Sequence, residues 1–369
     1  MLVKPQNLDN APKIKVIGVG GGGNNAINTM ISVHNISGVD FISVNTDSQA
    51  LKNSLAENKI QIGAELTKGL GSGGVAMIGK QAAEESVDLI HEYLAGSDMV
   101  FITAGLCVVT RTGASSVIAG IAKNLGALTI GVVTKPFVFE GQRRSSVAME
   151  GIDELKGKVD TLIVVPNQRL LDIIDRKISF LEAMRMVDDV LGQGVKSISD
   201  LITKTGMINV DFADVKSVMS NAGTALMGMG IATGESRAQD AARAAISSPL
   251  LEVSINGATG ILFNITSSAD LSMSEFDEAA QVILEAVDPE ANIIFGTTID
   301  ESIQDESIKI NVLATGFNEE ADKKILKHVE KKHDNDIDKT DNDTYNDIKE
   351  DNVDDEEYDT PAFLRRVRK

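Results

Sequence analysis

Residues 14–26, IKVIGVGGGGNNA, constrain the fold most strongly, because a short apolar run leads directly into four consecutive glycines. The run is typical of a strand buried on both faces. Glycine lets the backbone approach a phosphate, and a helix that begins there supplies unpaired N–H groups and the positive end of its dipole. A tight strand-to-helix turn fits the same G-x-G-x-x-G spacing. Four glycines cost more chain entropy than such a turn requires, so we favour phosphate binding.

Apolar runs of the same kind recur along the first half of the chain. They are VDFISVNTD (39–47), KIQIG (59–63), DMVFITAG (98–105), ALTIGVVTKP (127–136) and DTLIVVPN (160–167). Helical stretches, including 76–95 and 114–125, lie between them. This alternation predicts an α/β fold in which a doubly wound parallel sheet spans residues 13–178, after a flexible extension over 1–12.

A long central helix is predicted over residues 179–204. Its apolar side chains share one face at helical spacing: Phe180, Met184, Val187, Leu191, Val195, Ile198 and Ile202. Three further runs, at 260–268, 292–300 and 308–316, are expected to be strands. A helix is expected over 274–287, capped by Ser274 and Asp277. These elements predict a smaller α+β domain over 205–317.

The composition disfavours several classes of protein. A net charge of -19 argues against sequence-independent binding to nucleic acid. The single cysteine, Cys107, excludes an internal disulfide and suits a reducing compartment. None of the four histidines has a cysteine near it in the sequence, so no zinc-type metal site is expected. We find no secretory signal and no membrane-spanning run, and we expect a soluble, cytoplasmic protein.

A second glycine-rich stretch, GLGSGG (69–74), follows the third apolar run. Two such loops at neighbouring strand ends suggest a polyphosphate held from several sides. GVAMIGKQ (74–81) resembles a Walker A loop as far as Lys80. Gln81 cannot supply the hydroxyl that binds magnesium, and no strand directly precedes the stretch, so we interpret it as a coincidence.

Polar side chains also follow the predicted strands. They are Asn45, Asp47, Glu140, Arg144 and Asn167. Acid, amide and guanidinium groups are those that a purine and its ribose require. For Thr46 and Asp47 a helix N-cap is an equally good interpretation. Farther along the chain, NVDFADV (209–215) places Asp211 and Asp214 close together, with Asn209 beside them. Two carboxylates can polarise a water or hold Mg²⁺, or they can form a solvated loop and cap.

In this order the motifs resemble the FtsZ family, the bacterial tubulin homologues that build the division ring. The resemblance covers residues 12–317 and the tail, and it is carried by KVIGVGGGGNNA, VNTD, KGLGSGG, AAEES, FEG, VDTLIVVPN, INVDFADVKSVM, AISSPLLE and YDTPAFLRR. It implies a GTP-binding domain, a central helix and a tubulin-like C-terminal domain. It also implies a GTPase of cell division that uses Mg²⁺, stacks head to tail with itself, and acts in the cytoplasm at the mid-cell ring.

The resemblance assigns roles to individual residues. Residues implied to bind GTP are Gly20, Gly21, Gly22, Gly23, Asn24, Asn25, Asn45, Asp47, Gly71, Gly73, Gly74, Thr110, Thr112, Gly113, Glu140, Arg144, Asn167 and Asp189. The glycine loops would contact phosphates, Glu140 and Arg144 the ribose, and Asn167 and Asp189 the guanine. A neighbouring subunit would insert Asn209, Asp211 and Asp214 into this site, so hydrolysis would depend on polymerisation.

One stretch departs from the family pattern. Residues 107–113 read C-V-V-T-R-T-G, where the family usually has G-G-G-T-G-T-G. Valine resists positive φ, and a path that needs such angles would be strained by about 1 to 3 kcal/mol at Val108 and at Val109. The Arg111 guanidinium could obstruct a phosphate or pair with it. In addition, Met184 stands where a phenylalanine usually packs on the base.

The C-terminal tail divides into two parts. Residues 318–358 contain 16 Asp or Glu and 7 Lys with few apolar residues, which predicts a disordered acidic linker. Residues 359–369 are expected to form a recognition peptide for membrane adaptors and other division proteins. Its expected contact residues are Pro361, Phe363, Leu364, Arg365 and Arg366.

Three hypotheses remain open from the sequence. The first is a polymerising GTPase, attenuated by the altered loop. The second is a nucleotide-poor or inactive homologue that acts as a structural filament subunit. The third is a dinucleotide-dependent oxidoreductase, which Gly18 to Gly23 alone would allow.

Overall fold

The computed structural model describes residues 11–106, 109–173, 178–204, 208, 210–251, 254–300, 303 and 305–317. All of them belong to the first of two compact units into which the chain divides, Met1–Asp322 and Lys323–Lys369. Several predictions fall outside the described residues. These are the extension before residue 11, the acidic linker, the recognition peptide, Asn209, Cys107 and Val108.

The N-terminal strands form a parallel sheet, as predicted. Their order is β3-β2-β1-β4-β5-β6, and every neighbouring pair is parallel. The strands are β1 (Ile14–Val19), β2 (Val39–Asn45), β3 (Asn58–Gln61), β4 (Met99–Gly105), β5 (Leu128–Lys135) and β6 (Thr161–Pro166). Strands β4 and β5 are buried along their whole length, which explains their unbroken apolar sequences.

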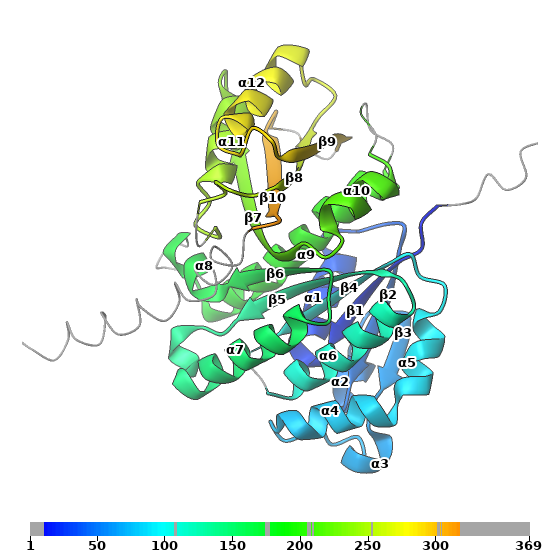
Figure 1. Ribbon diagram of the computed structural model, residues 1–369. Helices are drawn as coiled ribbons and strands as arrows, with labels where there is room; N and C mark the ends of the chain where they lie inside the picture. Colours follow the sequence, from blue (N-terminus) through cyan, green and yellow to red (C-terminus); the bar gives the residue numbers. More distant parts are fainter. Residues whose placement is uncertain are drawn as a thin grey trace, which may run out of the picture. The chain divides into compact units, whose positions relative to one another are not determined.

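Helices cover both faces of this sheet, which makes it doubly wound. The larger helices are α1 (Gly20–Ser32), α4 (Ala76–Glu85), α5 (Val87–Leu94), α6 (Val109–Asn124), α7 (Gln142–Lys156) and α8 (Asn167–Ile173). The shorter ones are α2 (Ser48–Lys52), α3 (Ala64–Thr67) and the 3₁₀ turn η1 (Val138–Glu140). Helix α6 contacts α4, α5 and α7, and this group lies in front of the strands in Figure 1. The stretch predicted as one helix over 76–95 is interrupted at Ser86.

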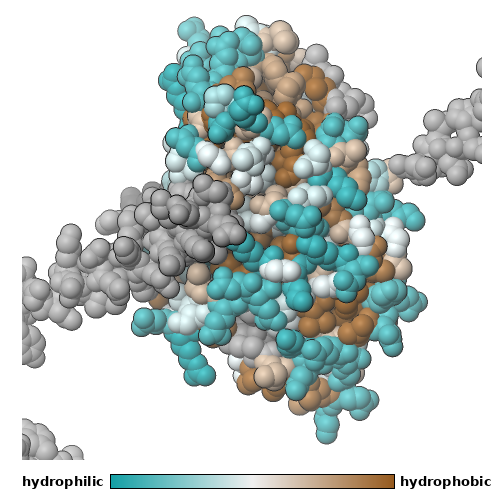
Figure 2. Space-filling model, in the orientation of Figure 1, coloured by the Kyte–Doolittle hydropathy of each residue, from teal (hydrophilic) through white to brown (hydrophobic). Residues whose placement is uncertain are grey.

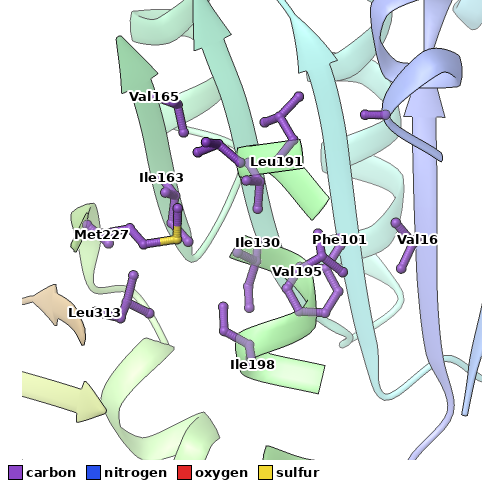
Figure 3. Packing of buried hydrophobic residues seen from close by; sticks show 14 of the residues in the cluster. Val16, Phe101, Ile130, Ile163, Val165, Leu191, Val195, Ile198, Met227 and Leu313 are labelled. Atoms are coloured by element: carbon purple, nitrogen blue, oxygen red, sulfur yellow. The ribbon is translucent and has the colours of Figure 1, made fainter. Parts of the chain in front are cut away.

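Helix α9 (Phe180–Thr203) is the predicted central helix. Ser179 caps it reciprocally with Glu182: the Ser179 Oγ accepts the Glu182 N–H at 3.2 Å, and Glu182 Oε2 accepts the Ser179 N–H at 3.0 Å. Leu191, Val195 and Ile198 are buried among residues of the sheet, as Figure 3 shows. Phe180 differs from the prediction, because its side chain lies at the first turn and is 69% exposed.

The described C-terminal elements are three helices and four strands, and the strands extend the sheet with mixed directions. They are α10 (Phe212–Met219), β7 (Gly223–Ala232), α11 (Arg237–Ile246), β8 (Gly260–Ser267), α12 (Met273–Leu284), β9 (Asn292–Ile299) and β10 (Ile308–Thr315). The strand order is β7-β10-β8-β9, with β10 antiparallel to β7 and β8, and β8 parallel to β9. Three parallel residue pairs, Thr161–Gly223 to Ile163–Ala225, join β6 to β7. The ten strands therefore form one continuous sheet.

Strand β7 was not expected from the sequence, because it contains glycines that weaken a strand signal. The structure explains two of them. A Cβ on Gly228 would lie 2.1 Å from the Ala245 carbonyl oxygen, and one on Gly230 would lie 2.0 Å from that of Ala241. Helix α11 thus packs directly on the backbone of β7, and only glycine allows this approach.

The predicted N-terminal cap of α12 is wrong. Ser272, not Ser274, is the N-cap, and it forms a capping box with Glu275 instead of Asp277. The predicted three-residue spacing is right, but it applies two residues earlier. Among the described helices, none is long and apolar enough to cross a membrane.

Candidate functional site

The predicted ligand residues lie at one edge of the N-terminal sheet. Strands β1 to β6 are parallel, so their carboxyl ends meet at that edge. Residues Gly20, Asn45, Glu140 and Asn167 follow or end β1, β2, β5 and β6, respectively. In open α/β sheets this edge is where ligands bind.

Some glycines of the first loop are required by the packing or the backbone conformation, while backbone N–H groups of the loop remain available to a ligand. Gly20 has a φ of 68°, which favours glycine. Gly18 and Gly23 are packing positions, since a Cβ on Gly23 would lie 2.4 Å from the Thr103 carbonyl oxygen. Helix α1 begins directly behind Val19 without a side-chain cap. Its first N–H groups therefore remain available for an anion.

Asn24 and Asn45 are buried together behind this loop. In the amide orientation that satisfies its neighbours, Asn24 donates to the Gly18 carbonyl at 2.8 Å and accepts from Asn45 Nδ2 at 3.3 Å. Asn45 Oδ1 accepts the N–H of Asp47 at 3.2 Å. The side chain of Asn24 is thus engaged within the protein, whereas Asn25 in the next position is exposed.

The second glycine loop is held beside the carboxyl end of β2 by backbone contacts. An isolated bridge joins Asp47 to Leu70, and the Ser48 N–H donates to the Gly69 carbonyl at 3.1 Å. Gly71, Gly73 and Gly74 have φ values of 88°, 60° and 76°. Successive N–H groups in such a path can form a concave anion site.

Asp47 takes the capping role that the sequence left open. Its Oδ1 accepts the N–H groups of Gln49 at 2.8 Å and Ala50 at 3.3 Å at the start of α2. The Walker-like stretch is not a phosphate loop in the structure. Lys80 lies within α4 and pairs with Glu154 of α7 at 3.4 Å.

The altered loop is partly helical. Helix α6 begins at Val109, so Val109 to Gly113 have right-handed helical backbone angles. The expected strain therefore does not arise at Val109, while Cys107 and Val108 lie outside the described residues. Thr110, Thr112 and Gly113 fall in the first turns of α6, whose N-terminus follows β4 at the ligand edge.

Glu140 and Arg144, which follow β5, pair with each other. Arg144 Nη1 donates to Glu140 Oε2 at 2.7 Å, while Glu140 Oε1 accepts the Phe137 N–H at 3.1 Å. Asn167 begins α8 and is 5% exposed. Its Oδ1 is buried and has no hydrogen-bond partner among the described residues. An unpaired buried acceptor is costly, and a ligand donor would satisfy it.

Asp189 lines a cavity of about 570 Å³ between α1 and α9. Thr29, Ser32 and Val33 form the α1 side, and Arg185 and Met186 line the α9 side with Asp189. Burial raises the pKa of Asp189, but the His34 and Gln193 side chains outweigh that effect and hold the pKa below its usual value. Asp189 is therefore ionised at neutral pH. A carboxylate facing a cavity of this size suits a ligand that presents N–H donors.

Asp211 and Asp214 lie far from this edge. Both are exposed, and Asp211 caps α10 by accepting the Asp214 N–H at 2.8 Å. Helix α9 rises along its axis by about 21 Å between Asp189 and Thr203, and α10 follows its far end. Thr161, the first residue of β6, donates to the Met219 carbonyl at 2.5 Å. The end of α10 therefore adjoins the amino edge of the sheet.

The sequence did not single out the residues that surround Asp189. Thr29 lies in α1 and Val33 directly follows it. His34 and Gln193 contact the carboxylate of Asp189 directly. Their separation along the chain leaves no local pattern, although Asp189 and Gln193 have the spacing of neighbours on a helix. No cluster of three metal-ligating side chains occurs in the described residues.

The fold and the glycine loops at the carboxyl edge define the class of tubulin-like GTPases. Residues 13–175 match the Tubulin/FtsZ family, GTPase domain, and residues 223–318 match the FtsZ family, C-terminal domain. This chain belongs to the FtsZ family. The family assignment sets aside the oxidoreductase hypothesis and places the chain among proteins whose family-level activity is GTP hydrolysis.

Solved structures agree with this assignment. An empty FtsZ dimer from M. jannaschii is 45% identical, with a TM-score of 0.80, covering 84% of this chain and 89% of that chain. A mutant form of M. jannaschii FtsZ gives the same identity and TM-score, with coverage of 83% and 92%. CetZ2 from Haloferax volcanii, a GTPgS-bound protofilament, is 18% identical, with a TM-score of 0.72 and coverage of 88% and 99%. The CetZ2 likeness shows a shared fold.

Proposed function

We propose that this protein is a self-assembling GTPase that forms the scaffold of the cytokinetic ring. The observation that carries the proposal is the convergence of two glycine loops, the Glu140–Arg144 pair and Asn167 at the carboxyl edge of one parallel sheet. These groups match the phosphates, ribose and base of a nucleotide. Asp189 lines the adjacent cavity.

Each group has a distinct part in binding GTP. The backbone N–H groups of Gly20–Gly23 and Gly71–Gly74 hold phosphate oxygens, together with the start of α6. Asn167 and Asp189 read guanine, and Glu140 and Arg144 hold the ribose. Mg²⁺ usually binds through phosphate oxygens and waters with one or two carboxylates, so the lack of a metal-ligating cluster among the described residues is compatible with it.

Hydrolysis is proposed to occur between stacked subunits. Asp211 and Asp214 are exposed and lie toward the edge of the sheet opposite the glycine loops. A head-to-tail neighbour can bring such carboxylates to the triphosphate, where they would orient the attacking water. A heterologous contact that does not close on itself generates a filament. The empty FtsZ dimer and the CetZ2 protofilament are consistent with such self-association.

Exposed apolar side chains beside the ligand edge support a subunit contact there. Phe139 and Phe180 are 63% and 69% exposed, and Leu181 is 61% exposed. The Phe139 ring stacks on Phe137 at 5.0 Å and meets Phe180 at 6.2 Å. The face drawn in Figure 2 mixes hydrophilic and apolar areas. Exposed aromatic residues that cluster next to a binding site are typical of interfaces.

The proposed cellular role includes the tail. The Phe363–Leu364 pair and the cations around it would bind membrane adaptors and other division proteins, with residues 318–358 as the linker. The proposed location is the cytoplasm, at the mid-cell division ring.

Nucleotide occupancy and phosphate release test the proposal. The purified full chain is expected to bind GTP in preference to ATP, and to release phosphate at a rate per subunit that rises cooperatively with protein concentration. Phe180→Asp should retain GTP binding but lose the concentration dependence, because a charge in the apolar contact opposes stacking. Failure to bind at saturating GTP would favour a second function, a structural filament subunit without nucleotide.

The altered loop is the specific reason to keep that second function. Glycine at positions 107, 108, 109 and 111 is expected to strengthen GTP binding by about tenfold, because bulky side chains no longer crowd the phosphates. It should also lower the thermal midpoint, since glycine at 109 and 111 weakens the first turn of α6 by about 1 kcal/mol per residue. Calorimetric titration and a melting curve measure both effects. Unchanged affinity would refute this account of the loop.

A further inference from the structure

Each carboxylate oxygen of Asp189 has one side-chain partner in the part of the chain that the structure describes. His34 Nε2 lies 3.0 Å from Oδ1, and Gln193 Nε2 donates to Oδ2 at 2.5 Å. The side chain of His34 is 10% exposed, whereas that of Asp189 is 37% exposed. His34 thus approaches from the protein side, and the carboxylate keeps an open side that lines the 570 Å³ cavity.

The His34 ring packs directly against the backbone of α9 at Gly192. A Cβ on Gly192 would lie 2.4 Å from His34 Cδ2 and 2.6 Å from Nε2, which no side chain at position 192 could tolerate without displacing the ring. The backbone of His34 is held as well, because its N–H donates to the Thr29 carbonyl at 3.2 Å at the end of α1. Asn35 then turns the chain with a φ of 45°. The imidazole is therefore placed by its own backbone and by the glycine opposite.

This arrangement leaves Asp189 ready for a second pair of donors. An ionised carboxylate accepts about four hydrogen bonds. Gln193 donates one to Oδ2, and His34 Nε2 lies within ion-pair distance of Oδ1. Guanine presents two parallel donors, its N1–H and its 2-amino group, which match the two oxygens of one carboxylate. Holding the carboxylate in one orientation removes an ordering cost that the ligand would otherwise bear.

We propose that His34, seated against Gly192, acts with Gln193 as a positioning pair that orients Asp189 toward the guanine edge and thereby sets base selectivity. The inference rests on the proposed function, in which Asp189 reads the base. It assigns to His34 no contact with the nucleotide itself.

The test compares GTP with ITP, which lacks the 2-amino group, using calorimetric titration of the full chain. His34→Leu removes the imidazole nitrogen that lies 3.0 Å from Asp189 Oδ1 and keeps most of the bulk of the side chain. It is expected to weaken GTP binding about tenfold and ITP binding about twofold, because the bidentate contact loses its preset geometry. His34→Gln restores a nitrogen donor the same number of bonds from the backbone, and should keep the wild-type selectivity to within about twofold.

Two further variants separate this inference from the proposed function. Asp189→Ala should abolish the preference for GTP over ITP. Gly192→Ala should behave like His34→Leu, since the new methyl group displaces the ring. If Asp189→Ala loses the preference but His34→Leu keeps it, the positioning role is wrong and base reading by Asp189 stands. Tighter GTP binding by His34→Leu would also overturn the inference, because His34 would then compete with the base. If the wild-type chain binds neither nucleotide, the proposed function and this inference both fail.

Discussion

Asp214→Asn is expected to lower the rate of GTP hydrolysis by about 10²- to 10³-fold and to leave GTP affinity within about twofold. The Asp214 side chain is exposed, and its carboxylate makes no hydrogen bond or ion pair within the described part of the chain. The substitution therefore removes a charge without breaking an internal contact. Binding should survive because the subunit's own pocket lies at the other edge of the sheet. Phosphate release from assembled filaments, with calorimetry for affinity, measures both quantities.

Asp211 provides the matched control for this experiment. Its carboxylate caps α10, so Asp211→Ala should lose hydrolysis and also about 1 kcal/mol of stability. Asp211→Asn keeps a capping oxygen and should lose hydrolysis alone. Mixing Asp214→Asn subunits with Asp189→Ala subunits should restore activity, because one variant contributes an intact pocket and the other intact acids. Wild-type turnover by Asp214→Asn filaments would rule out the proposed role of the acidic loop.

Arg237→Met is expected to lower the free energy of unfolding by about 2 to 4 kcal/mol. The guanidinium is 8% exposed and joins three segments of the C-terminal sheet region. Its Nε lies 2.6 Å from Glu275 Oε1, and its Nη1 lies 2.7 Å from Asp270 Oδ2 and 2.5 Å from the Glu306 carbonyl. Without the guanidinium, Glu275 Oε1 and the Glu306 carbonyl oxygen lose the hydrogen bonds that Arg237 donates to them. Urea unfolding measures the change, and the exposed Arg243→Met on the same helix should shift stability by less than about 0.5 kcal/mol.

The same cluster predicts a dependence of stability on pH. Arg237 is the largest cause that lowers the pKa of Glu275, to about 2 from an ordinary 4.5, and Asp270 is shifted in the same direction, chiefly by Ser268 and then Arg237. A carboxyl with a lowered pKa stabilises the fold above its unfolded pKa, and this stabilisation is lost as the pH falls toward the folded value. Wild-type stability from this source should therefore decline between pH 4.5 and about 2. A similarly steep decline in Arg237→Met would contradict the assignment.

The strands and the ligand edge could be predicted because they depend on local patterns. Buried parallel strands need continuous apolar residues, and the carboxyl ends of parallel strands must meet at one edge. Positions such as Gly20, Gly71 and Asn167 follow from those two facts. Strand β7 escaped prediction because Gly228 and Gly230 serve the approach of α11, a requirement that only the packed helix reveals.

Residues 14–26 by themselves determined the strand, the glycine turn and the helix that open a nucleotide-binding fold. The tertiary structure decided which partner each polar side chain contacts. Asn24 hydrogen-bonds to its neighbours behind the first loop, Asp47 caps a helix, and His34 and Gln193 contact Asp189. It also set Asp211 and Asp214 beyond the far end of α9. Hydrogen bonds and close approaches between distant segments depend on how whole elements pack, and no periodicity within a short stretch encodes that packing.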